Sequence, residues 1–306
     1  MQQNKRSGGK QVNIAVIADI HANAEALNAV LSDIESQHPD LVLCAGDLVG
    51  YGPQPNEVVE KIIDAKIPAV MGNYDDATAN FRLICGCDYT SETAQAVGEF
   101  SIRFTRETLE EKNKAHLRSL PYHLFYRIGE PLQPPALVPL PPESLSGLYP
   151  MYDPAFDTME DNAPQIQSYR EAVERYASPP KPAPGEWLIH VFHGSPRRLN
   201  EYLRMNTPIE ELRALVKLTP ANVMICGHSH QTFHKLVDGV HIINVGSVGK
   251  PKQGNPNATY ALIQLGDTVA VTFREVAYDV DTVVSEMKGH GHPQALIDII
   301  QTGIDS

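Results

Sequence analysis

The chain has 306 residues, of which 42% are hydrophobic and 20% charged, and this composition indicates a soluble globular protein rather than a disordered or membrane-embedded one. Its formal charge of -12 at pH 7 argues against nonspecific binding to nucleic acid, because an acidic surface repels the phosphate backbone. No apolar run approaches the ~18 residues that a membrane span requires, so we expect no membrane partner.

The amino-terminal segment and the cysteines bear on the cellular compartment. Residues 1–11 contain no apolar signal-peptide core and are expected to form a disordered tail, followed by a single domain over residues 12–306. The four cysteines lack zinc-finger spacing, and we expect reduced thiols in a cytoplasmic protein. They are Cys44, Cys85, Cys87 and Cys226.

The first ordered element is expected at residues 12–18, a nearly continuous apolar run that is typical of a buried parallel strand. Asp19 and His21 follow it, and the alternation of an extended chain places them on the same side, where both could reach one ion. Asn23 then has the residue type of an N-cap for a helix with one apolar face. Read alone, the Asp-x-His pair fits an ordinary turn better than a pair of metal ligands.

A second strand is predicted at residues 40–45, and it too is followed by a polar residue that could bind a metal ion. Asp47 supplies a carboxylate there, and the neighbouring glycines let the backbone approach a ligand closely. A third strand is predicted at residues 67–71, ahead of Asn73. Asparagine alone most often forms a turn, but this one again follows a strand.

The middle of the chain changes composition abruptly. A helical pattern over residues 91–120 gives way to a segment that holds 13 of the 24 prolines, between positions 131 and 184. Proline excludes central strands and long helices, except over residues 165–177, which could form one helix. We interpret residues 130–185 as an insertion or lid over the sheet edge or cleft mouth, and a mobile proline-rich linker fits the composition equally well.

Two further apolar runs end in histidines. The run at residues 187–192 is followed by His193 and a glycine, and His193 is a better ligand candidate than His190 because it lies at the strand's end. The run at residues 223–227 is followed by His228 and His230. Neutral imidazole is a common metal ligand, although a pair of surface histidines explains this stretch equally well when it is read alone.

The remainder of the chain predicts two hairpins and two helices. Residues 233–245 form a hairpin with Asp-Gly at its turn, and residues 258–278 form another. The glycine-bearing loop at residues 244–249 could place backbone N–H groups near an anion. Helices are expected around residues 282–287 and 293–300.

Taken together, five strand ends deliver oxygen and nitrogen ligands. These are too many for one zinc ion, but they suit two transition metal ions that share a carboxylate. The residues are Asp19, His21, Asp47, Asn73, His193, His228 and His230.

The motif order Asp-x-His, Gly-Asp-x-x-Gly, Gly-Asn-x-Asp, His-Gly and Gly-His-x-His resembles that of the calcineurin-like metallophosphoesterase family, over nearly the whole chain outside residues 130–185. The Tyr-Gly-Pro extension after Gly50 and the loop at residues 244–249 resemble its small bacterial and archaeal phosphodiesterase branch, which includes enzymes similar to diadenosine tetraphosphate hydrolases. The resemblance implies an α/β fold, a four-layer α/β/β/α sandwich with a proline-rich insertion.

The resemblance also implies a mechanism. A hydroxide that bridges two metal ions would attack phosphorus directly, without a phosphoenzyme. We expect two divalent transition metal ions, manganese first, with iron, zinc or nickel as alternatives. Asn73 and His193 would be catalytic as well as ligating. By the family pattern, Asp19, His21, Asp47 and His230 hold one ion, and Asp47, Asn73, His193 and His228 hold the other.

One position departs from the family pattern. Many members have histidine after the motif asparagine, where this chain has Tyr74. A phenol with an ordinary pKa of about 10 can donate a hydrogen bond, but it is a poorer proton donor than imidazolium at pH 7. We therefore expect a substrate with a good leaving group, such as a nucleotide phosphate or an activated aryl phosphate. The expected substrate contacts are Asn23, Tyr51, Tyr74 and Ser247.

These features predict a dinuclear metal-dependent hydrolase of small phosphodiester or nucleotide-type phosphate esters, acting as a homodimer. A metal-dependent protein serine/threonine phosphatase is one alternative, although it would need an open surface groove. A non-catalytic scaffold of the same fold is another, and its mark would be the loss of a ligand. None is lost here.

Overall fold

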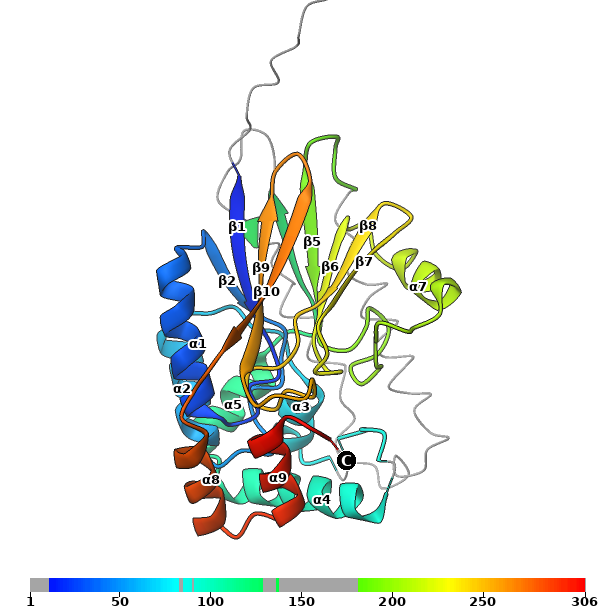
Figure 1. Ribbon diagram of the computed structural model, residues 1–306. Coiled ribbons are helices and arrows are strands. Elements are labelled where there is room, and N and C mark those ends of the chain that lie inside the picture. Colours follow the sequence, from blue (N-terminus) through cyan, green and yellow to red (C-terminus); the bar gives the residue numbers. More distant parts are fainter. Residues whose placement is uncertain (1–10, 83–84, 90, 129–135, 138–180, 306) are drawn as a thin grey trace, which may run out of the picture.

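Two mixed β-sheets face one another at the centre of the molecule, and helices cover both outer faces (Figure 1). The computed structural model describes residues 11–82, 85–89, 91–128, 136–137 and 181–305. Within these ranges, no helix is long and apolar enough to cross a bilayer.

The first sheet has the strand order β10-β9-β1-β2. Its central strand β1 pairs in parallel with β2 and antiparallel with β9, and β9 and β10 form the second predicted hairpin. The strands are β1 (Val12–Ile17), β2 (Leu41–Cys44), β9 (Ala258–Leu265) and β10 (Val269–Val276).

The second sheet has the order β4-β3-β5-β6-β8-β7. Strands β5, β6 and β8 run parallel to one another, and β7 and β8 form the first predicted hairpin. The positive φ angles of Asp238 and Gly239 at its turn are those that the Asp-Gly sequence predicts. The strands are β3 (Leu124–Ile128), β4 (Ala136–Leu137), β5 (Trp187–Val191), β6 (Val223–Cys226), β7 (Phe233–Val237) and β8 (Val240–Asn244).

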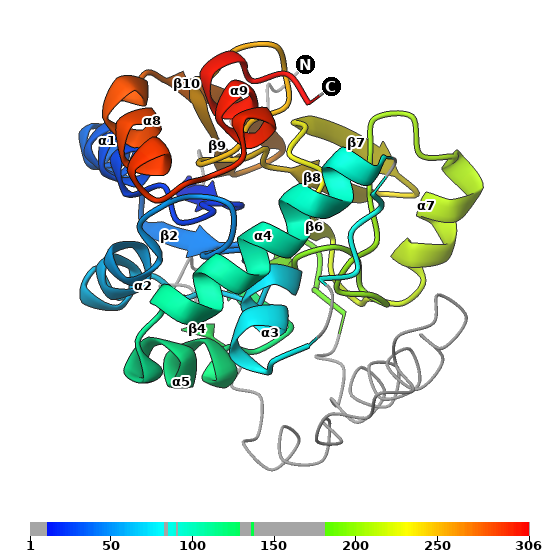
Figure 2. The ribbon, with the colours of Figure 1, turned by 90° about the horizontal axis from the view of Figure 1, so that it is seen from below.

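The helices fall into three sets. Helices α1 (Ala24–Gln37) and α2 (Pro55–Asp64) lie on the outer face of the first sheet, and α7 (Ile209–Val216) lies on that of the second. The others gather beyond one end of the sheets, where Figure 2 shows α4 crossing beneath the molecule. They are α3 (Asn73–Ala79), α4 (Glu92–Thr108), α5 (Glu111–Ser119), α8 (Val280–Gly289) and α9 (Gln294–Thr302).

Side-chain alternation along β1 explains the layering. Ile14 and Val16 point into the core between the two sheets, where they meet strands such as β5 and β6. Ala15 and Ile17 point the other way and pack against α1 and α2. Both faces of the strand are therefore buried, which confirms the predicted four-layer α/β/β/α arrangement.

Several local predictions can be compared with the structure directly. The side chain of Asn23 caps α1 by accepting a hydrogen bond from the backbone N–H of Ala26, as predicted. The helical pattern over residues 91–120 is confirmed as two helices, α4 and α5. The tail at residues 1–10, the predicted helix at 165–177 and most of the 130–185 insertion lie outside the described residues.

The predicted third strand at residues 67–71 is wrong. This segment makes only an isolated parallel bridge, between Ala69 and Cys44 of β2. Pro68 lacks an N–H group for a ladder, and the N–H of Met71 donates to the carbonyl oxygen of Pro121 instead of to a strand. The segment still leads the chain alongside β2, so Asn73 begins α3 close to the end of that strand.

Candidate metal centre

The polar residues that follow β1, β2, β5 and β6 converge in one buried place. Because β1 and β2 are parallel neighbours, and β5 and β6 likewise, the carboxyl ends of each pair lie side by side. The packing of the two sheets brings both pairs together. The donor atoms there form two groups, Asp19, His21 and His230 in one and Asp47, His193 and His228 in the other, with the atoms of each group within 4.8 Å of one another.

The first group is centred on Asp19. Its Oδ1 atom lies 3.4 Å from Nε2 of His230 and 3.8 Å from Nε2 of His21. The two imidazole Nε2 atoms are themselves only 3.1 Å apart. All three side chains are buried. This group can surround a single ion.

The second group is centred on His193. Its Nε2 atom lies 3.3 Å from Oδ2 of Asp47 and 3.0 Å from Oδ1 of Asn73. The amide of Asn73 is oriented by its Nδ2 group, which donates to the carbonyl oxygen of Cys85 and to Sγ of Cys87. Its oxygen is thereby directed at the same space as the imidazoles.

Asp47 lies between the two groups. Its Oδ2 atom, which is 3.3 Å from His193, is also 3.8 Å from Nε2 of His21 in the first group. The other oxygen, Oδ1, accepts the backbone N–H of Tyr74 at 2.8 Å. One carboxylate oxygen therefore faces both groups while the second is held by the backbone, which is the placement that a shared ligand requires.

The histidine rings are held by the backbone. In three of them, Nδ1 lies within hydrogen-bonding distance of a main-chain carbonyl oxygen, which can only accept, so Nδ1 carries a proton and Nε2 is turned toward the site. The pairs are His21 with Val49 at 3.1 Å, His193 with Ala45 at 2.8 Å and His230 with Lys250 at 2.6 Å.

The backbone at these positions is strained. Five residues of the two groups have φ between 48° and 64°, the left-handed region that costs a non-glycine residue roughly 1–2 kcal/mol. These five are Asp19, His21, Asp47, His228 and His230. Gly227 contributes through its small size, because a Cβ atom there would lie 2.5 Å from Oδ2 of Asp19. Such conformations persist where the surrounding packing enforces them, and they cluster at functional sites.

The electrostatics of the site are incomplete without cations. Burial raises the pKa of Asp19, whereas it lowers the pKa of His21 to about 3. Burial also opposes protonation of His193, yet Asp47 and Asp19 raise its pKa to about 9. Among the described residues, Oδ1 of Asp19 and Nε2 of His228 are buried without a hydrogen-bond partner. Carboxylates and imidazoles that face one space in this way fit divalent transition metals, and a bound cation would take the place of the proton that the two carboxylates favour on His193.

Asp75 supports the loops that carry these ligands. Its Oδ1 accepts the N–H groups of Leu48 and Val49, and its Oδ2 accepts the N–H of Gly72. Burial and the nearby Asp47 carboxylate raise the pKa of Asp75 to about 7, and these hydrogen bonds counteract part of that shift. The side chain thus ties the loop after β2 to the start of α3.

Two predicted substrate contacts are aromatic and line the first group. The ring of Tyr51 lies edge-on to His21, with 4.8 Å between ring centroids, and the ring of Tyr74 lies edge-on to the same imidazole at 5.5 Å. Tyr74 is buried, and its hydroxyl group lies 3.4 Å from that of Tyr89. Burial and neighbouring thiols and phenols raise the pKa of Tyr74, so it is less suited to proton donation than an ordinary phenol. A hydrogen bond from Tyr74 to substrate stays a prediction.

Asn23 and Ser247, the other two predicted substrate contacts, are engaged within the fold. The amide of Asn23 caps α1 and donates to the carbonyl oxygen of Gly249. The hydroxyl of Ser247 donates to the carbonyl oxygen of Asp19 and accepts the N–H of Lys250. Both side chains are buried, so the geometry favours a structural role for them.

The prediction that the loop at residues 244–249 binds an anion is wrong, because its backbone donors are also engaged within the fold. Its N–H groups donate within the protein, for example those of Ser247 to Thr259, Val248 to Ala18 and Gly249 to Asp19. A backbone donor that is already satisfied offers nothing to an anion. The loop instead fastens the segment after β8 to the end of β1.

The structure places His193 within the candidate site and His190 away from it. His190 is buried on the outer face of the second sheet, where its Nε2 lies 2.7 Å from Nδ1 of His123 and its Nδ1 lies 3.0 Å from Oγ1 of Thr219. Sequence reasoning missed Tyr202, whose ring packs against His228 with 4.0 Å between centroids and 31° between the ring planes. No motif marks Tyr202, because its position depends on how the segment after β5 folds back over the site.

Comparison with known proteins shows that the chain is similar to one protein family. The calcineurin-like phosphoesterase family matches residues 12–232 of the chain. Uncharacterized protein MJ0912 from Methanocaldococcus jannaschii is 38% identical over 298 residues, which span 92% of this chain and 95% of that protein.

Two solved structures share the fold. A metallophosphoesterase from Sphaerobacter thermophilus aligns with a TM-score of 0.59 and 24% identity, covering 96% of this chain and 99% of its own. The hypothetical protein PH1004 from Pyrococcus horikoshii OT3 aligns with a TM-score of 0.67 and 20% identity, covering 96% and 100%. At these sequence identities, the similarity shows a shared fold alone.

Proposed function

The chain belongs to the calcineurin-like phosphoesterase family, and we propose that it uses two divalent transition metal ions to hydrolyse small phosphodiester or nucleotide-type phosphate esters. Membership of the family and the two groups of metal-ligating side chains make it a metal-dependent phosphoesterase. The dinuclear centre, manganese as the first choice of metal, and the class of substrate are the parts that we propose.

One observation carries the dinuclear proposal. The single oxygen Oδ2 of Asp47 faces His21 in one group and His193 in the other, at 3.8 and 3.3 Å. A mononuclear site would leave one of the two buried groups without a cation, at a large cost in desolvation. Asp19, His21, His230 and Asp47 would hold one ion, and Asp47, Asn73, His193 and His228 the other.

The side chains divide the remaining work between them. Bound divalent cations supply Lewis acidity and lower the pKa of water, so that a nucleophile exists at neutral pH. The backbone carbonyls that accept from Nδ1 of His21 and His193 hold each ring with Nε2 toward the site. Asp75 fixes the two loops that carry Asp47 and Asn73, so these ligands are positioned before substrate arrives.

The alternatives predict different outcomes. A scaffold of this fold would be expected to have lost a ligand, whereas all seven predicted ligands converge in this site. A protein phosphatase would accept phosphoserine peptides as readily as small esters. A homodimer in the cytoplasm remains our expectation for the assembly.

The test is metal analysis of the purified protein, with hydrolysis of bis-p-nitrophenyl phosphate, p-nitrophenyl phosphate, a dinucleoside polyphosphate and a phosphoserine peptide. We expect two metal ions per chain and a preference for the small diester or polyphosphate substrates. Asp47→Asn should lose metal and lower kcat/KM by more than about 100-fold. Asp40→Asn is the matched control, because Asp40 is exposed and lies just before β2, at the strand's other end from Asp47.

Each of the other outcomes contradicts a defined part of the proposal. One metal ion per active chain would contradict the dinuclear centre. Two metal ions without turnover of any substrate would favour a scaffold. A preference for the phosphoserine peptide would indicate a protein phosphatase. Absence of bound metal, together with no activation by added manganese, would overturn the site itself.

A further inference from the structure

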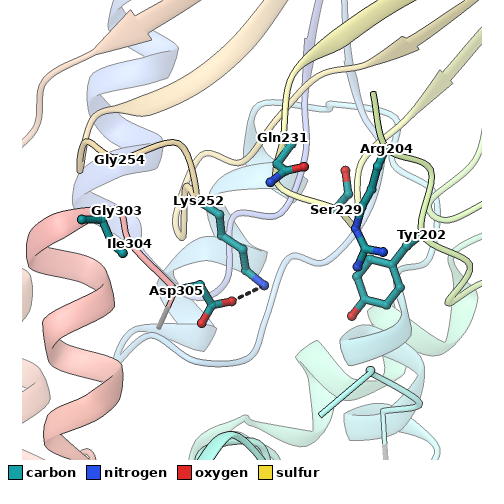
Figure 3. Close-up of a pocket in the computed structure, with 9 residues that line it drawn as sticks. All are labelled: Tyr202, Arg204, Ser229, Gln231, Lys252, Gly254, Gly303, Ile304 and Asp305. Atoms are coloured by element: carbon teal, nitrogen blue, oxygen red, sulfur yellow. Dashed lines mark ion pairs between the residues drawn. The ribbon is translucent and has the colours of Figure 1, made fainter. Parts of the chain in front are cut away.

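A second site lies beside the metal centre. A pocket of about 430 Å³, within the range of roughly 300–1,000 Å³ for small-molecule sites, opens between the segment after β5 and the segment after α9 (Figure 3). Ser229, which lies between the ligands His228 and His230, lines it. The pocket is therefore one residue away from two metal ligands.

The pocket has cations on two sides. Figure 3 shows Arg204 and Tyr202 on one side and Lys252 on the other. The guanidinium carbon of Arg204 lies 4.4 Å from the centroid of the Tyr202 ring, a cation–π contact that holds the head group at the pocket wall. In the described part of the chain, no acidic side chain forms an ion pair with Arg204. The protein as a whole has a formal charge of -12, so this local positive charge differs in sign from the net charge and favours the binding of an anion.

Among the described residues, Lys252 forms an ion pair with a single carboxylate, and a second lysine lies near that carboxylate. Its Nζ lies 2.5 Å from Oδ2 of Asp305, in the segment after α9, and Nζ of the buried Lys250 lies 3.7 Å from the same oxygen. Asp305 is 37% exposed, and Lys252 is 24% exposed. One partly exposed carboxylate thus faces two ammonium groups, and a partly exposed ion pair of this kind is readily exchanged for a ligand of higher charge.

The pocket and the metal centre share structural elements. The ring of Tyr202, which lies under Arg204, packs against the imidazole of His228 in a tilted contact. Lys250 lies two residues before Lys252, and its carbonyl oxygen accepts a hydrogen bond from Nδ1 of His230. A ligand that spans from the metal centre to Lys252 would therefore contact two elements that also orient metal ligands.

We propose that Arg204 and Lys252 bind a second anionic group of the substrate, a phosphate beyond the one that is hydrolysed, and that Asp305 occupies Lys252 until this group displaces it. The substrate would then be a compound with two or more phosphates, such as a nucleoside polyphosphate, rather than a simple monoester. The substrate assignment rests on the proposed function, whereas binding of an anion in the pocket does not.

The test combines selectivity with binding, both on the full-length metal-loaded protein. Selectivity is the ratio of kcat/KM for a dinucleoside polyphosphate to that for bis-p-nitrophenyl phosphate. Binding is the Kd of the α,β-methylene analogue of adenosine diphosphate, measured by calorimetry. Lys252→Gln and Arg204→Gln should each lower the selectivity about tenfold and raise the Kd by a similar factor, because each removes a charged donor.

Asp305→Asn gives the discriminating result. If Asp305 competes with the second phosphate, its neutralisation should lower the Kd about threefold, and this gain should vanish in the Asp305→Asn/Lys252→Gln double variant. Asp298→Asn on α9 and Lys288→Gln on α8 are matched controls, because both residues lie outside the pocket and should leave both readouts unchanged.

The outcomes separate this proposal from the function. Turnover of both substrates, with selectivity and Kd unaffected by the pocket variants, would overturn the second anion site and leave the phosphoesterase intact. Analogue binding that responds to Lys252 and Asp305, without turnover of any substrate, would keep the anion site and overturn the proposed function. A loss of thermal stability in Asp305→Asn without any gain in affinity would show that Asp305 is only a structural tether.

Discussion

Asp47 and Gly72 approach each other so closely that a Cβ atom added to Gly72 would lie 2.1 Å from Oδ1 of the carboxylate. Asp47 follows β2 and belongs to the second group, whereas Gly72 follows residues 67–71 and directly precedes Asn73. The position of the Asp47 carboxylate thus depends on the absence of a side chain at Gly72.

Gly72→Ala should displace Asp47 and weaken metal binding by about 10- to 100-fold, with a matching loss of activity at limiting manganese. Metal content after dialysis and the manganese dependence of the rate are the measurements. Gly289→Ala is the control, because a Cβ there would meet nothing within 4 Å. Unaltered metal affinity in Gly72→Ala would show that the carboxylate can move without consequence.

Removal of metal should destabilise the protein. Oδ1 of Asp19 and Nε2 of His228 are buried without a hydrogen-bond partner among the described residues, so bound cations should stabilise the folded state alone. Manganese at about 100 times its Kd should contribute about 2.7 kcal/mol for each ion bound, which corresponds to a rise in Tm of about 5 °C per ion over protein in EDTA. Calorimetric scans with and without EDTA measure this shift. Identical Tm values would argue that these side chains do not hold metal.

The His123–His190 pair should make the protein sensitive to acid. Burial lowers the pKa of His123 to about 3, whereas a histidine in the unfolded chain titrates near 6.5. Between these values the unfolded state binds the additional proton, so stability is constant above about pH 6.5 and falls as the pH drops toward 3. One such group changes the free energy of unfolding by about 1.4 kcal/mol per pH unit.

Urea unfolding of the wild type and His123→Gln between pH 7 and 4.5 tests this. EDTA is present throughout, so that release of metal does not contribute. The variant should have a shallower decline with falling pH, even if it is less stable at pH 7 because the contact with His190 is lost. His38→Gln, which removes an exposed imidazole, serves as the control. Parallel declines for the wild type and His123→Gln would mean that His123 is protonated in the folded protein.

Tyr74 should matter for its ring more than for its hydroxyl group. Because that hydroxyl lies beside Tyr89, we expect Tyr74→Phe to lower kcat no more than about threefold. Tyr74→Ala should destabilise the protein by roughly 3–5 kcal/mol, since a fully buried ring is lost. A tenfold or larger loss of kcat in Tyr74→Phe with unchanged stability would instead assign the phenol a role toward the substrate.

The sequence alone predicted the central strands and their polar ends. Apolar runs such as that before Asp19 identified β1, β2, β5 and β6, because a strand buried on both faces is almost continuously apolar. It failed at residues 67–71, where an apolar run led to the prediction of a strand although Pro68 cannot complete a ladder. Helix α1 and the two hairpins were predictable because their signals, a cap and two turns, are local.

The features of the candidate site can likewise be separated into those that the sequence predicted and those that only the structure showed. The sequence by itself determined the residue types of the candidate ligands and, for all of them except Asn73, their place after a buried strand, because the end of an apolar run marks where the chain leaves the sheet. Asn73 instead begins α3. Only the tertiary structure decided that Asp47 faces both groups and that Arg204 and Lys252 face one pocket. It also decided that Ser247 and its loop form their hydrogen bonds within the protein. These relationships join segments far apart in the chain, and they depend on how two sheets pack, which no local pattern encodes.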